Sequence, residues 1–166
     1  MSIAETFIAE MEQEAKATRA VLARVPDDKL DWAPHPKSMT LGKLAHHIAT
    51  TPALAGIICA TDFLDVATAK MPPVPAAAAA IAAELEECLK QAREAMGALD
   101  DAAMFKPWSF KNSGKTLMTL PKVAVLRAVF LNHWYHHRGQ ISVYLRLLDI
   151  PVPSIYGPSA DENPFA

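Results

Sequence analysis

His133 and His137 are four residues apart in a stretch with helical periodicity, and His47 lies in an earlier helical stretch. Residues four apart occupy the same face of a helix, so these two imidazoles can bind one divalent ion together. A third imidazole from a neighbouring helix would complete a facial arrangement with open positions for water or substrate. The spacing therefore predicts a metal site made of His47, His133 and His137.

The periodicity of the earlier stretch indicates which of its histidines faces the core. On an ideal helix, His47 falls in the same stripe as a set of apolar residues and threonines, whereas His46 points about 100° away from it. We therefore expect His46 to be exposed to solvent. His35 lies in a connector with two prolines, Leu30–Pro36, and is the weakest candidate ligand. The residues that share the stripe of His47 are Thr40, Leu44, Thr51, Leu54, Ala55 and Ile58.

The later stretch also supplies side chains that can support the ligands. Gln140 and Tyr144 share the face of the histidine pair, and His136 lies on its flank. These three side chains can orient the ligand imidazoles or line a pocket, although each can equally be a surface or packing residue. Without a metal, the core-facing histidines would instead need hydrogen bonds to carbonyls or buried hydroxyls.

Arg138 points away from the predicted ligand face. We expect it to tie down the irregular C-terminal tail, in which Asp161 and Glu162 are candidate partners. Trp32 and Trp108 are expected to cover the ends of the helical core, or to wall a pocket beside the metal.

Four helical stretches must position these residues. Apolar residues recur at three- and four-residue steps in each stretch. The second begins at a cap formed by Ser38 or Thr40, and Pro52 should kink it or remove one of its backbone bonds. Residues 100–120 form either a short hairpin or a folded loop. The stretches cover residues 2–24, about 40–58, 76–99 and 121–148, with a linker at 71–75. The chain is thus predicted to be a single all-α domain, 1–166, with the architecture of a four-helix bundle.

Composition excludes several classes of function. The chain has 166 residues, of which 51% are hydrophobic and 20% charged, and a formal net charge of −2. We therefore expect no nucleic-acid partner. No apolar run is long enough to span a membrane, and Met1–Thr6 does not resemble a secretory signal. Cys59 and Cys88 show no CxxC spacing, so we expect reduced thiols and a cytoplasmic protein.

Two segments carry a family resemblance. Residues 41–49, LGKLAHHIA, resemble the first histidine motif of the DinB/YfiT-like superfamily, and residues 133–140, HWYHHRGQ, resemble its second motif. The connector at 32–38 and the tail at 152–162 are also similar to those of many members. The resemblance covers essentially the whole chain. The HxxxHRGQ run together with the tail is quite specific, whereas the first motif alone would be weak.

The resemblance implies an up-down-down-up four-helix bundle, usually dimeric, with a divalent metal held by three histidines. Carried over to this chain, the ligands are His47, His133 and His137. The doubling at His46 leaves open whether His46 can replace His47. Because the fourth helix also carries Val125, Val129 and Trp134 beyond its core stripe, an apolar surface for a homodimer is expected there.

Characterised proteins of the superfamily include thiol-dependent enzymes, such as a mycothiol-dependent maleylpyruvate isomerase and bacillithiol S-transferases. The first hypothesis is therefore a metal-dependent thiol S-transferase that uses a low-molecular-weight thiol as cosubstrate. A metal-dependent hydrolase is a variant of it. The alternatives are a non-catalytic metal-binding or stress-response module, and a purely structural dimer whose histidines form hydrogen bonds. The sequence leaves the substrate unknown and the metal open among Zn, Ni and Fe.

Overall fold

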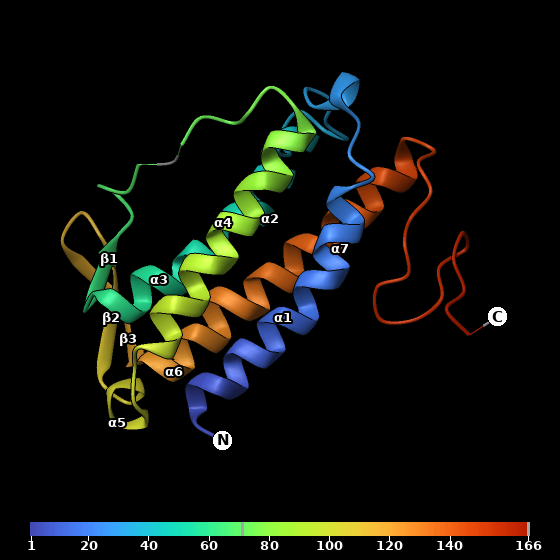
Figure 1. The fold of residues 1–166 in the computed structure, drawn as a ribbon. Coiled ribbons are helices and arrows are strands. Elements are labelled where there is room, and N and C mark those ends of the chain that lie inside the picture. Colours follow the sequence, from blue (N-terminus) through green and yellow to red (C-terminus); the bar gives the residue numbers. More distant parts are fainter. Residues whose placement is uncertain (71, 166) are drawn as a thin grey trace.

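The computed structural model describes residues 1–70 and 72–165, and most of these residues are helical (Figure 1). Met71, in the predicted linker, and Ala166 lie outside the described residues. The helical elements are α1 (Ile3–Leu22), η1 (Asp27–Lys29), α2 (Leu41–Thr50), α3 (Ala53–Ala60), α4 (Ala78–Gly97), α5 (Asp101–Met104), α6 (Lys122–Val125), η2 (Leu126–Leu131) and α7 (Asn132–Leu147). The strands are β1 (Phe63–Asp65), β2 (Pro107–Asn112) and β3 (Lys115–Pro121).

The long helices begin and end close to the predicted positions. Ser2 caps α1, and its hydroxyl accepts a hydrogen bond from the Glu5 backbone N–H at 3.1 Å. Thr40 is the cap of α2, which settles the choice between Ser38 and Thr40. Pro52 separates α2 from α3, as predicted, because a proline supplies no backbone N–H to the preceding turn.

A small sheet makes the prediction of an all-α protein too narrow. The order of its strands is β1-β2-β3, with β1 parallel to β2 and β2 antiparallel to β3. The hairpin of β2 and β3 turns at Ser113 and Gly114, whose φ angles of 50° and 77° suit a two-residue turn. The Asp65 carboxylate accepts hydrogen bonds from both of their backbone N–H groups, at 2.9 and 2.7 Å, and so fixes the turn against β1.

The last helical stretch is continuous but irregular. Its middle part, η2, is a π-helix, in which each turn holds one more residue than an α-helical turn. This extra residue rotates α7 relative to an ideal wheel drawn through the whole stretch. Trp134 and Arg138 consequently face the core, and they are 0% and 1% exposed.

The structure corrects the predicted dimer surface. Val125 and Trp134 are fully buried and Val129 is half-buried, so the first two cannot form an outer apolar face. The Trp134 indole Nε1 donates a hydrogen bond to the Ile48 carbonyl at 2.9 Å. Because Pro52 has no backbone N–H, the Ile48 carbonyl has no hydrogen-bond donor within its helix. The bond from Trp134 therefore joins α2 to α7 at positions adjacent to His47 and His133.

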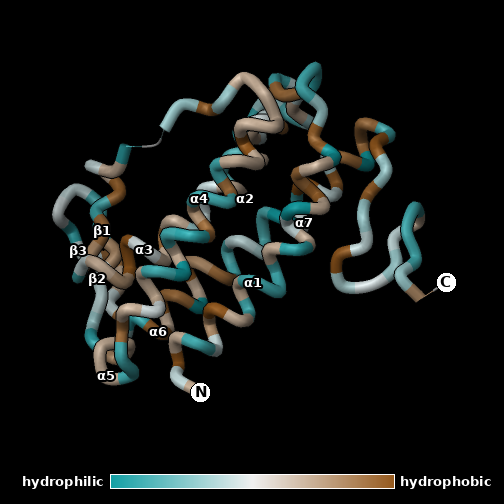
Figure 2. The backbone as a smooth tube through the Cα atoms, viewed as in Figure 1, coloured by the Kyte–Doolittle hydropathy of each residue, from teal (hydrophilic) through white to brown (hydrophobic). Residues whose placement is uncertain are grey.

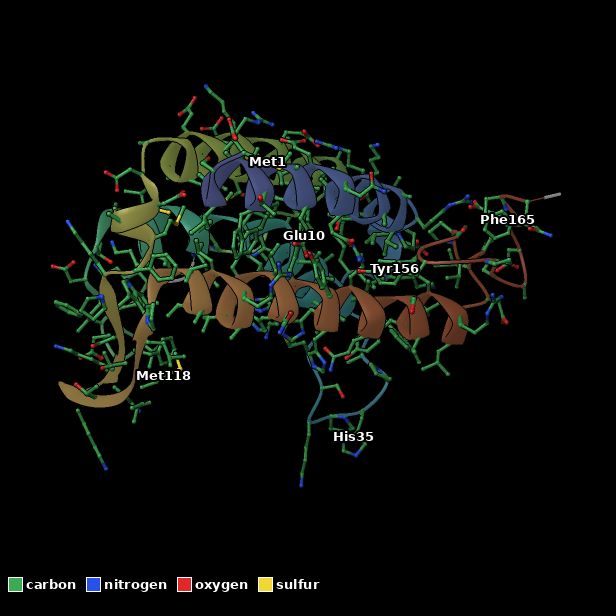
Figure 3. All side chains as sticks on the ribbon, turned by 90° about the horizontal axis from the view of Figure 1, so that it is seen from below. Met1, Glu10, His35, Met118, Tyr156 and Phe165 are labelled. Carbon is green, nitrogen blue, oxygen red and sulfur yellow. The ribbon has the colours of Figure 1, made fainter. Side chains whose placement is uncertain are left out.

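Arg138 ties the tail to α1, as expected, but through other partners. Its guanidinium donates to the Glu14 carbonyl at 2.8 Å and also contacts the Glu14 carboxylate and the Tyr156 hydroxyl. Figure 3 shows Tyr156 reaching from the tail toward α1 and α7. The predicted partners are bound elsewhere, because Asp161 pairs with Arg146 and Glu162 pairs with Arg24.

The core is formed where the apolar sides of the helices meet. Hydrophilic and hydrophobic residues alternate along α1 and α4 in Figure 2, as expected for helices with one buried side. Helix α2 contacts both α4 and α7, so its two flanks are covered. Among the residues that the structure describes, no helix is both long and apolar enough to cross a membrane.

Candidate metal centre

Helices α2 and α7 bring the three predicted ligands together. His47 Nε2 and His133 Nε2 are 3.3 Å apart, and His137 Nε2 and His133 Nε2 are 2.7 Å apart. All three ligand atoms lie within 4.8 Å of one another. His47 lies in the last turn of α2, one residue from Ile48, whose carbonyl accepts the Trp134 bond to α7. The local packing of α2 and α7 therefore fixes the meeting point of the imidazoles.

The other ring nitrogens determine which atoms carry protons. His137 Nδ1 lies 2.7 Å from Gln140 Oε1, and the His133 ring bonds to the backbone of Val129. Both partners accept hydrogen bonds, so in the neutral rings the proton lies on Nδ1 and each Nε2 presents a lone pair. Two lone pairs that face each other at 2.7 Å repel, and a cation between them removes that repulsion.

The spacing of these nitrogens fits a single divalent ion. Nitrogen ligands at about 2.0–2.1 Å from an ion are separated by about 2.9 Å at a right angle and about 3.4 Å at the tetrahedral angle. The two Nε2–Nε2 separations of 2.7 and 3.3 Å lie close to these values. The three histidines can therefore bind a metal ion, and among the described residues no further His, Cys, Asp or Glu joins their cluster.

The surroundings keep these imidazoles neutral, which is the form that binds metals. Burial, together with the neighbouring His137, His133 and His46, lowers the pKa of His47 to about 4. Burial also lowers the pKa of His133 and His137, although the hydrogen bonds that their rings donate to the Val129 backbone and to Gln140 oppose this effect. Protons therefore compete weakly with a metal ion near neutral pH.

His46 is not exposed, contrary to the prediction. It is 3% exposed, and its Nε2 lies 2.8 Å from the Glu84 carboxylate on α4. These two buried atoms have no other partner among the described residues. The wheel failed here because it assumed a single buried stripe, whereas α2 is covered on both flanks. His46 faces α4 and His47 faces α7, so His46 does not take the place of His47 in this fold.

The remaining predicted residues divide into neighbours and distant groups. Gln140 contacts His137 directly. The exposed ring of His136 lies beside the ring of His137, and their centroids are 5.0 Å apart. The Tyr144 hydroxyl instead bonds to the Met39 carbonyl at 3.3 Å, near Trp32. Figure 3 shows His35 on the connector, which projects away from the helices. His35 and Tyr144 therefore belong to the connector region and not to the histidine cluster.

Sequence reasoning missed a pocket beside the cluster, which we call the His47 pocket. Its volume is about 270 Å³. Helices α2, α3 and α4 and the segment after β1 form its walls, and no single stretch of sequence marks it. Its lining residues are His47, Thr50, Thr51, Ala53, Leu54, Ile57, Lys70, Pro72 and Cys88.

Replacing Gln140 with alanine should weaken metal binding about 10–100-fold without preventing it, which is the usual effect of removing a partner of a ligand histidine. The reason is that His137 would lose the acceptor that holds its proton on Nδ1. Competition with a chromophoric chelator measures this change. Gln140→Glu retains the acceptor and should restore the affinity, and an unchanged affinity in Gln140→Ala would contradict the assigned tautomer.

The metal-free protein should lose stability as the pH falls from about 6.5 to about 4. Unfolded His47 takes up a proton near the ordinary pKa of 6.5, whereas the folded protein holds the pKa of His47 near 4. Protonation in this window therefore favours the unfolded chain, and above it His47 adds no pH dependence. Urea unfolding at several pH values tests this, because His47→Asn should reduce the slope and His35→Asn should not. Equal slopes in both variants would be inconsistent with the buried, neutral His47.

The fold agrees with comparisons to known proteins. The chain belongs to the DinB family, whose family model matches residues 1–164. It is 32% identical to the uncharacterized protein YrdA of Bacillus subtilis (strain 168), over 94% of this chain and 89% of that protein. The recognition of the family from its two histidine motifs is thus confirmed.

Two solved structures share the predominantly helical fold. A DinB-like protein from Bacillus cereus ATCC 10987 has a TM-score of 0.74 at 27% identity, covering 92% of this chain and 97% of that chain. The DinB-like protein YjoA from Bacillus subtilis has a TM-score of 0.70 at 14% identity, covering 90% and 96%. The second likeness concerns the fold alone.

Proposed function

We propose that the protein binds one divalent metal ion through His47, His133 and His137 and acts as a metal-dependent enzyme of the thiol S-transferase type. The observation that carries the proposal is the convergence of three Nε2 atoms, two of them 2.7 Å apart with their lone pairs facing. When bound, a divalent ion supplies Lewis acidity and lowers the pKa of a coordinated thiol or water. Zn, Ni and Fe all suit imidazole ligands.

The residues of the chain itself position and protect this chemistry. Gln140 and the Val129 backbone orient two of the imidazoles, and burial keeps all three neutral. One of the three proposed metal ligands, His47, lines the mainly apolar His47 pocket, in which an organic substrate can lie out of bulk water. None of the described residues that line the pocket is a carboxylate, so they offer no acidic side chain as a general base. This favours transfer of a thiol, which is itself the nucleophile, over hydrolysis.

The direct test incubates metal-loaded protein with low-molecular-weight thiols and electrophilic acceptors. Thioether formation should exceed that of a His137→Ala control treated identically. Turnover equal to that of the control would overturn the transferase assignment. If the protein shows no such turnover but still binds stoichiometric metal, the transferase assignment would be replaced by that of a non-catalytic metal-binding module.

The assembly is also part of the proposal. We propose a single domain over residues 1–166, in which α1, α2 with α3, α4, and α6 to α7 form the up-down-down-up bundle. A cytoplasmic location accords with the two free cysteines, Cys59 and Cys88.

The homodimer is supported by Val143 and Leu147, which lie four residues apart on α7 and are 57% and 58% exposed. Sedimentation of the protein and of Val143→Lys would test it, since the variant should be monomeric.

A further inference from the structure

The His47 pocket has the size of a site for a small organic molecule. Its volume of about 270 Å³ lies just below the range of about 300–1,000 Å³ that is usual for drug-sized ligands. Leu54 and Ile57 of α3 give it aliphatic walls, and His47 joins it to the histidine cluster. A molecule in the pocket therefore lies against the ring of a proposed metal ligand.

The threonines of the pocket offer no free hydroxyl proton to a ligand. Thr50 Oγ1 donates to the His46 carbonyl at 2.9 Å, and Thr51 Oγ1 donates to the His47 carbonyl at 2.6 Å. Both hydroxyl protons are thus used within α2. The pocket consequently behaves as an apolar cavity although it contains two threonines.

Cys88 reinforces this apolar character. Burial raises the pKa of its thiol, and the nearby Glu84 and Glu87 raise it further. The thiol therefore stays protonated near neutral pH, and a protonated thiol behaves as a small apolar group with a weak donor. Cys88 is consequently a wall of the pocket and not its nucleophile.

Lys70 is the exception among the lining residues, because it brings a cation to an otherwise apolar cavity. No acidic residue lines the pocket with it, and among the described residues no carboxylate lies within ion-pair distance of its ammonium. An ammonium beside aliphatic walls attracts a ligand that is anionic at one end and apolar along its body.

We infer that the His47 pocket binds a small organic anion, whose apolar body lies between α2, α3 and α4 and whose anionic group is held by Lys70. This narrows the substrate class of the proposed enzyme, and the reactive role of the anion rests on that proposed function. Binding of the anion itself requires only the pocket, so the two ideas can fail separately.

Cys88 provides a readout of occupancy that needs neither metal nor turnover. Octanoate is a suitable probe, with octan-1-ol and octylamine as neutral and cationic molecules with the same body. In the metal-free protein, octanoate should slow alkylation of Cys88 by N-ethylmaleimide, measured by peptide mass spectrometry. Cys59 is an internal reference, because it is 6% exposed and burial raises its pKa to about 11. Alkylation of Cys59 would reveal unfolding.

Variants separate the charge from the cavity. Lys70→Gln should weaken protection by octanoate about tenfold, the size expected when one charge-assisted hydrogen bond is lost. Protection by octan-1-ol should not change. Lys43→Gln, an exposed lysine of α2 that does not line the pocket, is the matched control and should behave as the unaltered protein.

The alkylation of Cys88 distinguishes the anion site from the proposed enzyme. Protection of Cys88 by octanoate that is stronger than by octan-1-ol or octylamine, and that depends on Lys70, supports the inference. No protection, or equal protection by all three molecules, overturns it even if the protein binds metal and transfers thiols. Protection in a protein that binds no metal would instead retain the anion site and remove the proposed enzyme.

Discussion

Replacing His133 with alanine should abolish stoichiometric metal binding and lower the affinity by more than about 100-fold, since loss of a mere partner of a ligand costs about 10–100-fold. His133 is the central ligand, because its Nε2 lies 3.3 Å from that of His47 and 2.7 Å from that of His137. Without it, the two remaining imidazoles come from different helices and no longer form an i, i+4 pair. Elemental analysis of protein after metal loading and gel filtration measures the change.

His136→Ala is the matched control for this experiment. His136 is on the same helix and beside His137, but its exposed ring takes no part in the cluster of three nitrogens. The control should bind metal as the unaltered protein does. Equal losses in the two variants, or full binding by His133→Ala, would show that the ion is held elsewhere.

Replacing Arg138 with leucine should lower the free energy of unfolding by about 3–5 kcal/mol, the usual cost of breaking a buried ion pair. Arg138 is 1% exposed and bonds to both the carboxylate and the carbonyl of Glu14. The variant would leave the Glu14 carboxylate, 14% exposed, with Tyr156 as its remaining donor. Urea unfolding monitored by circular dichroism gives the value.

Arg146→Leu provides the comparison. Arg146 also pairs with a carboxylate and also holds the tail, through Asp161, but its side chain is 48% exposed. Exposed ion pairs contribute about 0–1 kcal/mol, so this variant should be destabilised far less. If both substitutions had the same effect, burial would not be the source of the strength of the Arg138 pair.

The histidine cluster could be predicted because it depends on local spacing. The separation of His133 from His137 places them on one face whatever the exact helix axis. Pro52 likewise predicted a break in the second helical stretch. The position of His47 opposite the pair followed from the stripe of Leu44 and Thr51, which holds over a regular helix.

The errors arose where the chain departs from a single regular helix with one buried side. The π-helical η2 shifts the faces of α7, so an ideal wheel placed Trp134 on the outside although it is fully buried. His46 was misplaced because α2 is covered by two other helices. The three-residue strand β1 is too short to show a pattern, and its pairing with β2 depends on contacts distant in sequence. The His47 pocket likewise depends on contacts between residues that are distant in sequence.

The most direct test is anomalous diffraction from crystals of the protein grown with Co²⁺ or Zn²⁺. We expect one strong anomalous peak about 2.0–2.1 Å from Nε2 of each of His47, His133 and His137, the usual length of such metal–nitrogen bonds. The ion should have further, exchangeable ligands on its open side. A cluster without a peak, or a peak bound by other residues, would contradict the proposed metal site.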